Sequence, residues 1–431
     1  MMKVKDTKKE KKEKIEKKEV KKEKKKKIID KVKSKLKGKS KTTYGLLEVC
    51  IFSFIFMLFG IVLGYLFTYG RDTYTGKKIP KSMEEFISVY ENIKANHYGK
   101  LDEQKLIDAA ISGMVGSMED PYSSYMDENS VDEFNEEITG SYVGIGVTID
   151  FSENTNKVIV VNPGDSADKA GMQVGDIIIK VNGEDVSNKF GDELSCLIRG
   201  EEGTSVNVTV KRGDKEVDLD IVRSKIEIQS VTGKVINKND KKVGVIKVTK
   251  FSSNTYGQFE RELKKLEKDN IDSLVIDVRD NLGGQLSQAR KILNLFFDKK
   301  TVLFQMQSTE ETVKVRGTDN KTRSYPVAVI INNSSASAAE VVAACFKDNY
   351  KKAYIVGDNS FGKGTIQKTV TLKSGSKIKY TIQKWLTPKG DWVEGEGVKP
   401  KYKVSNDENY YNNPTDENDK QLQKAIELVS K

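Results

Sequence analysis

The chain has 431 residues, enough for two or three domains, and a formal net charge of +10. Residues 1–43 carry 21 lysines against seven acidic residues, a net +14, which leaves −4 for the other 388 residues. This distribution argues against a nucleic-acid partner, because the basic segment lacks interleaved aromatic residues. Three cysteines and one histidine exclude a disulfide framework and a cysteine–histidine metal cluster, so no cofactor is expected.

Residues 1–43 are predicted to form a basic, solvated tail. An uncharged run of 21 residues, Val49–Tyr69, follows and is long enough to cross a bilayer as a helix. We expect a transmembrane signal anchor over 44–69, because a cleaved signal peptide would have a shorter apolar region. Lysines crowd its N-terminal side, so the positive-inside rule places the N-terminus in the cytoplasm. The predicted protein is single-pass in the cell membrane, with its folded part extracytoplasmic.

The remainder changes character along the chain. Apolar residues first recur at helical spacing, then short β-branched runs alternate with glycine, asparagine and aspartate turns, and finally apolar strands alternate with helices. Alternating strands and helices predict α/β layering around a partly parallel sheet. The predicted divisions are a polar linker (70–81), an N-terminal helical region (82–139), a compact, mostly β domain (140–224), an α/β domain (225–405) and a C-terminal helical segment (406–431).

A group of serines lies where a buried strand of the α/β domain gives way to a helix, in INNSSASAAEVVAACF, Ile331–Phe346. A helix N-terminus offers unpaired backbone N–H groups and the positive end of a dipole, and both suit a developing oxyanion. Serine is also a favoured N-cap residue, so the same side chains could simply cap the helix. The turn is therefore a candidate nucleophile site, with capping as the alternative.

A nucleophilic serine needs a base to remove its proton. The only histidine, His97, follows a predicted helix near the linker, where an ordinary surface position is the commoner explanation. A lysine can replace histidine in this role, and Lys363 lies between glycines in SFGKG. Burial can lower a lysine pKa from about 10.4 to roughly 7–8, which would leave the amine largely neutral. The alternative is a phosphate contact or a solvated charge, although the spacing is not that of a Walker A loop.

A third stretch, DVRDNLGGQ at Asp277–Gln285, places two glycines after a buried strand. Together the three stretches resemble the carboxy-terminal processing peptidases, or tail-specific proteases, which use a serine–lysine dyad. The family patterns D-x-R-x-N-x-G-G, S-A-S-A-x-E and S-F-G-K-G-x-x-Q appear in order at 277–284, 335–340 and 360–367. Three modest motifs in this order are highly specific.

The resemblance covers roughly residues 82–431. GSYVGIGV and NPGDSADKAGMQVGDIIIKVNG look like a PDZ domain of the type these enzymes carry, and SMEDPYSSYM resembles the family segment ahead of it. The implied fold is multidomain α+β: a transmembrane helix, a helical segment, a β-rich PDZ domain and an α/β protease core. The core is expected to be crotonase-like, with a partly parallel sheet.

The motifs imply roles for individual residues of the protease core. Ser337 would be the nucleophile and Lys363 the general base and later the general acid. Gln367 would orient the lysine amine. The backbone N–H groups of Ala338 and Gly283 would form the oxyanion hole, with the choice between the two neighbouring glycines left open.

In the PDZ domain, Gly144, Ile145 and Gly146 match the loop that receives a C-terminal carboxylate. Arg199 is a candidate for an interdomain contact that senses a bound tail. The sequence departs from the family pattern in three places. Ala339 stands where the family often has serine. The spacing from Ser337 to Lys363 is one residue longer than is typical of the family, and the GVKPKY segment lacks the aspartate that often follows its proline.

The resemblance implies a membrane-anchored serine endopeptidase that recognises C-terminal tails through its PDZ domain and cleaves them through an acyl-enzyme. Expected partners are protein substrates with exposed C-terminal tails and the membrane through a single span, with a homodimer through the terminal helices as a further possibility. Two alternatives from other classes stay open. One is a catalytically inert PDZ scaffold that binds protein tails; the other is an α/β enzyme acting on a small molecule.

Overall fold

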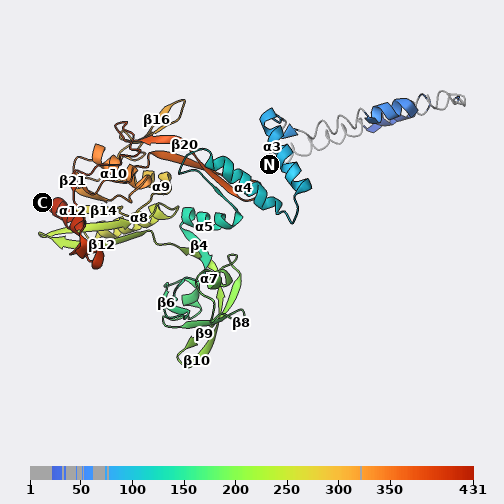
Figure 1. The fold of residues 1–431 in the computed structure, drawn as a ribbon. Helices are drawn as coiled ribbons and strands as arrows, with labels where there is room; N and C mark the ends of the chain where they lie inside the picture. The colour runs from blue at the N-terminus through green and yellow to red at the C-terminus, as the bar shows by residue number, and fades with distance from the viewer. Residues whose placement is uncertain are drawn as a thin grey trace, which may run out of the picture. The chain divides into compact units, whose positions relative to one another are not determined.

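A computed structural model of the chain describes residues 22–31, 34, 45, 51, 53–61, 73–74, 77–320 and 323–431 (Figure 1). The chain divides into two compact units, Met1–Glu103 and Gln104–Lys431. In the first unit β1 (Thr73–Tyr74) pairs antiparallel with β2 (Lys77–Lys78), and α3 (Lys81–Asn96) follows.

The predicted membrane span falls partly outside the described residues. Residues 53–61 are helical and exposed, whereas residues 49, 50, 52 and 62–69 are not described. Within the described ranges, no helix has both the length and the apolar character that crossing a bilayer requires. Of the basic tail, residues 22–31 and 34 are described, and they are helical and exposed.

The second unit opens with α4 (Glu103–Gly116, which begins at the boundary), β3 (Ser124–Met126) and α5 (Glu128–Thr139). Helix α5 starts at Asp127, whose side chain accepts a hydrogen bond from the backbone of Ser130, and ends at Gly140 with φ of 69°. A Cβ at Gly140 would lie 2.3 Å from Oδ1 of Asn254, so only glycine fits this turn. The Nδ2 of Asn254 donates to the carbonyl of Gly140, which fixes the end of α5 against the α/β core.

The β-rich domain contains one sheet of order β10-β9-β7-β6-β5, with β8 paired to β7. Its elements are β5 (Val147–Asp150), β6 (Lys157–Val161), α6 (Ser166–Lys169), β7 (Ile177–Val181), β8 (Glu184–Asp185), α7 (Asp192–Ile198), β9 (Ser205–Arg212) and β10 (Lys215–Val222). Strands β4 (Ser141–Gly144) and β11 (Ser224–Glu227) pair antiparallel, so the chain enters and leaves the domain along one ladder. Strand β5 lies at the edge of the sheet, where its outer side can accept another strand.

The α/β core is built on a six-stranded sheet of order β12-β13-β14-β17-β18-β21. Strands β12 and β13 pair antiparallel, and the other neighbours pair parallel, as the sequence predicts. Its strands are β12 (Val231–Lys238), β13 (Lys241–Val248), β14 (Ser273–Asp277), β17 (Val327–Ile331), β18 (Ala353–Gly357) and β21 (Tyr402–Lys403). A second sheet contains β16 (Thr312–Arg316), β15 (Val302–Gln307), β20 (Lys377–Leu386) and β19 (Thr365–Thr371), with β3 paired to β20.

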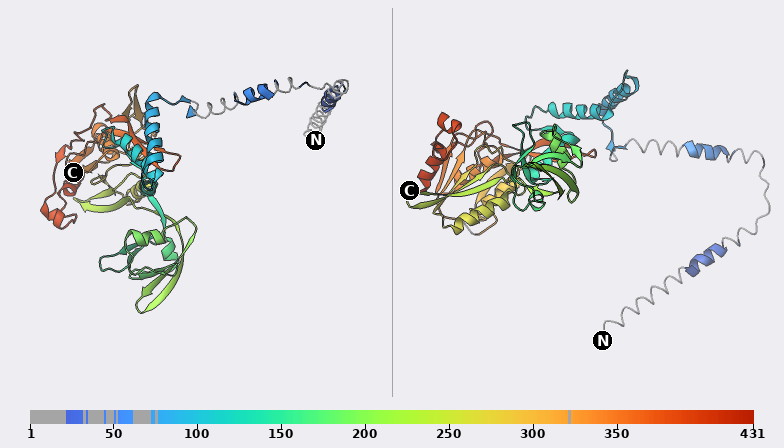
Figure 2. Two further views of the ribbon diagram at one scale, coloured as in Figure 1. Left: turned by 45° about the vertical axis from the view of Figure 1, so that its right-hand side comes forward. Right: turned by 90° about the horizontal axis from the view of Figure 1, so that it is seen from below.

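Helices cover both faces of the six-stranded sheet (Figure 2). Leu274 and Ile276 of β14 face a cluster formed with α8 (Thr255–Lys268), α9 (Leu286–Leu293) and α10 (Ala338–Asn349). Val275, between them, faces the opposite cluster, which is formed with α12 (Lys420–Val429); the short α11 (Glu408–Asn412) precedes that helix. Because alternate residues of a strand point to opposite faces, a strand covered on both sides must be apolar throughout.

Candidate active site

Ser337 lies at the turn between β17 and α10, as its sequence position predicts. Its φ is 54°, a left-handed value that is uncommon for a residue with a side chain and costs about 1–3 kcal/mol. Such strain often occurs where a side chain must be held in one direction. The turn places Ser337 at the N-terminus of α10, whose first backbone N–H groups have no acceptor within the helix.

The buried carboxylate of Glu340 connects this serine turn to the glycine-rich loop. One of its oxygens, Oε2, accepts hydrogen bonds from the backbone nitrogens of both Ser337 and Lys363, each at 2.8 Å. The other oxygen accepts from Oγ of Ser360 at 2.6 Å and from the backbone of Gly362 at 2.7 Å. Burial raises the pKa of Glu340, and these four donors oppose that effect. A single side chain therefore fixes the backbone positions of the two dyad candidates.

The amine of Lys363 is partly shielded from water. Its Nζ lies 4.4 Å from the centre of the Tyr122 ring, and its backbone carbonyl accepts from the indole nitrogen of Trp385 at 2.7 Å. Burial, followed by the positive charge of Lys379, lowers the pKa of Lys363. This is the direction that a general base requires, since only the neutral amine can accept a proton.

Ser337 and Lys363 line one cavity of about 470 Å³, together with Gly283 and Gln367. Its other lining residues come from α5, the loop after β13, the glycine turn (residues 282–285), the start of α9, and strands β19 and β20. They include Phe134, Glu137, Ile138, Lys250, Leu286, Ile366, Lys379 and Trp385. The structure therefore brings together four of the predicted site residues around a space large enough for a peptide side chain.

Gln367 follows a β-bulge in the ladder between β19 and β20, a feature that changes the direction of the next side chain. Its Nε2 donates to the hydroxyls of Thr365 at 2.9 Å and Thr381 at 3.0 Å. The amide nitrogen is thus occupied, and the carbonyl oxygen remains as the group that can accept from an amine. This orientation suits the predicted role of Gln367.

Gly283 lies directly against the serine turn. A Cβ at this position would lie 2.8 Å from the carbonyl of Ala336 and 3.2 Å from the backbone nitrogen of Ala338, and φ is +99°, so glycine is required. The backbone nitrogen of Gly283 donates to Oδ1 of the buried Asn281 at 2.9 Å. The proposed oxyanion donor is therefore occupied by an internal acceptor in this structure.

The predicted carboxylate loop lies between β4 and β5 of the β-rich domain. Gly146 has φ of +83°, and a Cβ there would lie 2.5 Å from Cβ of Asp165. The carbonyl of the buried Ile145 accepts from the backbone of Ala167, the second residue of α6. These contacts hold Gly144, Ile145 and Gly146 at the start of the edge strand β5.

Arg199 follows α7 and contacts two side chains near α5. Its Nη1 lies 2.8 Å from Oε1 of Glu136, and its guanidinium lies 5.1 Å from the centre of the Tyr142 ring. Glu136 belongs to α5, whose residues Phe134 and Ile138 line the same cavity as Ser337 and Lys363. Arg199 thus connects the β-rich domain to a helix that forms part of that cavity.

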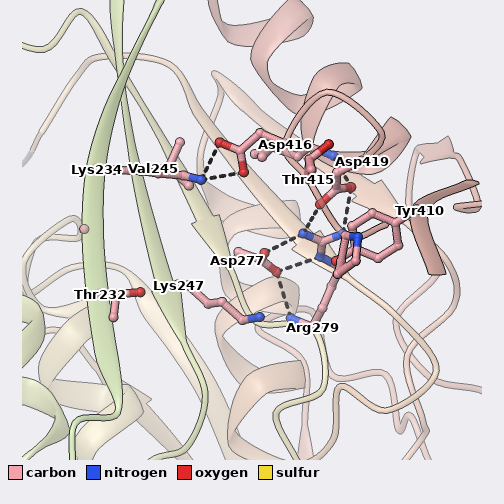
Figure 3. A pocket seen from close by; sticks show the side chains of 13 residues that line it. Thr232, Lys234, Val245, Lys247, Asp277, Arg279, Tyr410, Thr415, Asp416 and Asp419 are labelled. Atoms are coloured by element: carbon pink, nitrogen blue, oxygen red, sulfur yellow. Dashed lines mark hydrogen bonds and ion pairs between the residues drawn. The ribbon is translucent and has the colours of Figure 1, made fainter. Parts of the chain in front are cut away.

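A second, charged cavity of about 280 Å³ surrounds Arg279 of the D-x-R motif (Figure 3). The buried guanidinium donates to both carboxylate oxygens of Asp277, at 2.7 and 2.9 Å, and to both of Asp419, at 2.7 and 2.9 Å. Burial opposes its charge, but the two carboxylates outweigh this and raise the pKa of Arg279. Asp419 also caps α12 by accepting from the backbone of Leu422. The motif thus joins α12 to the start of the glycine turn.

Replacing Arg279 with methionine is expected to lower the free energy of unfolding by about 3–5 kcal/mol, because two buried carboxylates lose their partner. Urea unfolding of the full chain, followed by fluorescence of the buried Trp385, measures this loss. The matched control is Lys234→Met in the same cavity, whose ion pair with Asp416 is about half exposed and should contribute less than about 1 kcal/mol. Equal losses in the two variants would contradict a structural role for the Arg279 network.

Several residues around the site are not predicted from the sequence. The spacing of Ser337 and Glu340 matches a capping box, and this signal could have identified Glu340. No sequence signal places Tyr122 at Lys363, because 240 residues separate them in the chain. Of the cysteines, Cys345 is buried, whereas Cys196 is exposed despite its apolar neighbours in sequence. His97 is exposed at the end of α3.

The β-rich domain and the α/β core with its serine turn define the class of protein to which this chain belongs. It is a serine protease that carries a PDZ domain. Family models match three parts of the chain: peptidase family S41 over residues 242–404, a PDZ domain over 157–212 and the N-terminal domain of the activating protease CtpB over 69–130.

The chain is similar over most of its length to curated proteases. A probable CtpA-like serine protease of Staphylococcus aureus (strain COL) is 36% identical over 344 residues, which cover 79% of this chain and 68% of that protein. A protein with the same description in Staphylococcus haemolyticus (strain JCSC1435) is 37% identical over 321 residues, covering 73% and 63%. The chain belongs to peptidase family S41. Among solved structures, a photosystem II D1 C-terminal processing protease is 24% identical, with a TM-score of 0.44 and coverage of 76% of this chain and 94% of that chain.

Proposed function

We propose that the protein is a membrane-anchored serine endopeptidase that binds C-terminal tails of extracytoplasmic proteins through its PDZ domain and cleaves those proteins with a Ser337–Lys363 dyad. The observation that carries the proposal is the shared acceptor: one oxygen of Glu340 binds the backbone nitrogens of Ser337 and Lys363. The side chains of the same two residues line one cavity.

In the proposed reaction the neutral amine of Lys363 takes the proton of the Ser337 hydroxyl while Oγ attacks the peptide carbonyl carbon. The resulting oxyanion would accept hydrogen bonds from the backbone N–H groups of Ala338 and Gly283. The ammonium of Lys363 then gives its proton to the leaving nitrogen as the C–N bond breaks, which forms the acyl-enzyme. Water, deprotonated by the same amine, attacks the ester carbonyl carbon, and the ammonium returns its proton to Oγ of Ser337 as the C–O bond breaks. Gln367 would hold the amine in position throughout.

The oxyanion hole requires one local rearrangement. The N–H of Gly283 must leave Oδ1 of Asn281 before it can donate to the substrate. Asn281 is itself anchored, since its Nδ2 donates to the carbonyl of Val248 at 2.8 Å. Glycine permits the peptide to turn at low cost, so substrate binding could supply the energy for this exchange.

Tail recognition is proposed to occur at the edge strand β5. An extended peptide would add to this strand, and its terminal carboxylate would bind the backbone of the Gly144–Gly146 loop. Arg199 would sense the bound tail, because its contact with Glu136 reaches the helix that lines the catalytic cavity.

The proposed location rests on the sequence alone. The uncharged run Val49–Tyr69 would anchor the chain, and the lysine-rich tail would keep the N-terminus in the cytoplasm. The catalytic unit would then face extracytoplasmic proteins. Homodimerisation through the terminal helices remains a prediction; in α3 the exposed side chains include Phe86 and Val89.

Cleavage of an unfolded protein that ends in an apolar tail tests the proposed function. The full chain in detergent should cleave it, the Ser337→Ala variant should bind without cleaving it, and the same substrate with an amidated, charged tail should be cleaved more slowly. Binding of the tail by both forms with no cleavage by either would instead favour the inert PDZ scaffold. Equal cleavage of both substrates would contradict tail recognition.

A further inference from the structure

A tight turn of the helical region, Asp120–Ser123, lies against the catalytic lysine. The ring of Tyr122 lies 4.4 Å from Nζ of Lys363, and its hydroxyl donates to Oε1 of Glu394 at 3.3 Å. The other oxygen of Glu394 accepts from the backbone of Gly364 at 2.6 Å. Glu394 therefore links the ring to the loop that carries the Lys363 amine.

The same turn also contacts the strand that supports Gln367. The hydroxyl of Ser123 donates to Asp120 at 2.5 Å and accepts from the backbone of Thr381 at 3.3 Å. The hydroxyl of Thr381 in turn accepts from Nε2 of Gln367 at 3.0 Å. Strand β3, which follows the turn, pairs with β20 and fixes this arrangement in register. The turn thus contacts the surroundings of both the lysine and the glutamine.

We propose that Tyr122 is a positioning residue for the general base: its ring covers the Lys363 amine and keeps water away from it, so that the amine stays neutral and ready to accept the proton of Ser337. This inference rests on the proposed function. Tyr122 acts only through Lys363, since it does not line the catalytic cavity.

Two effects of the ring on the amine oppose each other. Excluding water disfavours the ammonium form and can lower a lysine pKa by up to about 3–5 units. A cation over an aromatic face is attracted by the ring, which would raise the pKa. Burial is the largest influence on the pKa of Lys363 and lowers it, so removal of a ring that covers the amine should raise that pKa.

The charged groups around the amine come from several elements, and none of them is removed when Tyr122 is replaced. They are Lys379 of β20, Glu340 of α10, Asp120 of the turn and Glu394 of the loop after β20, with Glu137 and Lys250 on the cavity wall. Both Tyr122→Ala and Tyr122→Phe remove the hydroxyl that donates to Glu394, so a shift in the alanine variant alone reports the ring and not a change at Glu394.

The test measures how readily the Lys363 amine reacts as the pH changes. The full chain carrying Ser337→Ala is acetylated with a trace of acetic anhydride over a range of pH, and mass spectrometry quantifies the peptide that contains Lys363. In Tyr122→Ala the midpoint of reactivity should move to higher pH by about one unit or more. Tyr122→Phe keeps the ring and should leave the midpoint in place.

Tyr125→Ala is the matched control for general loosening. This tyrosine lies three residues further along the same segment, with its hydroxyl donating to Asp108 at 2.6 Å. No midpoint shift in Tyr122→Ala, a shift to lower pH, or an equal shift in Tyr125→Ala would overturn the inference. If circular dichroism shows that Tyr122→Ala does not fold, Ser123→Ala is measured in its place, because it loosens the turn and retains the ring. Its midpoint should also move to higher pH, and an unchanged midpoint would overturn the inference.

The measurement needs no turnover, so it separates the two proposals. If the unmodified chain fails to cleave any unfolded protein while the midpoint still shifts, the proposed function fails and the covering role of Tyr122 stands. If cleavage occurs and the midpoint does not move, the dyad stands and the covering role fails.

Discussion

Replacing Lys363 with methionine is expected to lower kcat/KM for peptide-bond cleavage by on the order of 10⁴- to 10⁶-fold, because the serine loses its base. Methionine has a similar length and packs well against an aromatic ring, so the fold should be retained. Cleavage of an unfolded protein by the full chain, with thermal unfolding measured in parallel, checks both expectations.

Lys379→Met is the matched control, because it removes a lysine from the same cavity without removing the base. It should retain cleavage, although loss of the neighbouring positive charge should raise the pKa of Lys363. Cleavage by Lys363→Met at a rate close to that of the unmodified chain would refute the dyad.

The proposed dyad also fixes the sign of the pH dependence of cleavage. Burial and Lys379 lower the pKa of Lys363, and only the neutral amine accepts a proton. The rate of cleavage should therefore rise with pH through this lowered pKa and then level off. The plateau should begin at lower pH than an exposed lysine would allow, and at higher pH in Lys379→Met.

Replacing Glu340 with alanine is expected to have the second-largest effect. Four donors, including the backbone of Ser337 and Lys363, would lose their acceptor inside the protein. Each unsatisfied buried group costs about 1–3 kcal/mol, so the free energy of unfolding should fall by roughly 4 kcal/mol or more. Cleavage should fall by about 10²-fold or more even under folding conditions, since misplacement by 1 Å has a cost of that size.

Glu340→Gln separates the two consequences. Its single oxygen can still accept from the two dyad backbones, and its amide can donate to the hydroxyl of Ser360, which leaves the N–H of Gly362 without an acceptor. Urea unfolding and kcat should both lie between those of the unmodified chain and Glu340→Ala. A glutamine variant as inactive as alanine, yet fully stable, would show that the charge of Glu340 acts on catalysis directly.

The sequence was most informative where a pattern has one physical meaning. The unbroken apolar runs at β14 and β17 indicated strands buried on both faces, and both clusters that cover them are present. The turn after β17 could be located because a buried strand, a serine and a helix follow one another. The orientation of Gln367 was not predictable, because it depends on a bulge and on two threonine hydroxyls.

Other features depend on residues far apart in the chain. The N–H of Gly283 is bound by Asn281 within its own motif, and nothing in the motif distinguishes this state from an open oxyanion hole. The apolar spacing of the C-terminal segment indicated a helix, but both faces of the sheet strands are apolar, so the pattern could not show which face α12 would cover.

The position of α12 bears on the order in which the protease can become active during synthesis. Residues 420–429 complete the apolar cluster on one face of the six-stranded sheet, and the buried Arg279 receives its second carboxylate from Asp419. Until that stretch has left the ribosome, the apolar residues of this sheet face stay exposed to water. The guanidinium of Arg279 then has only one of its two carboxylate partners. The nascent chain therefore cannot complete its core, or steady the turn beside Ser337, before residues 419–429 have left the ribosome.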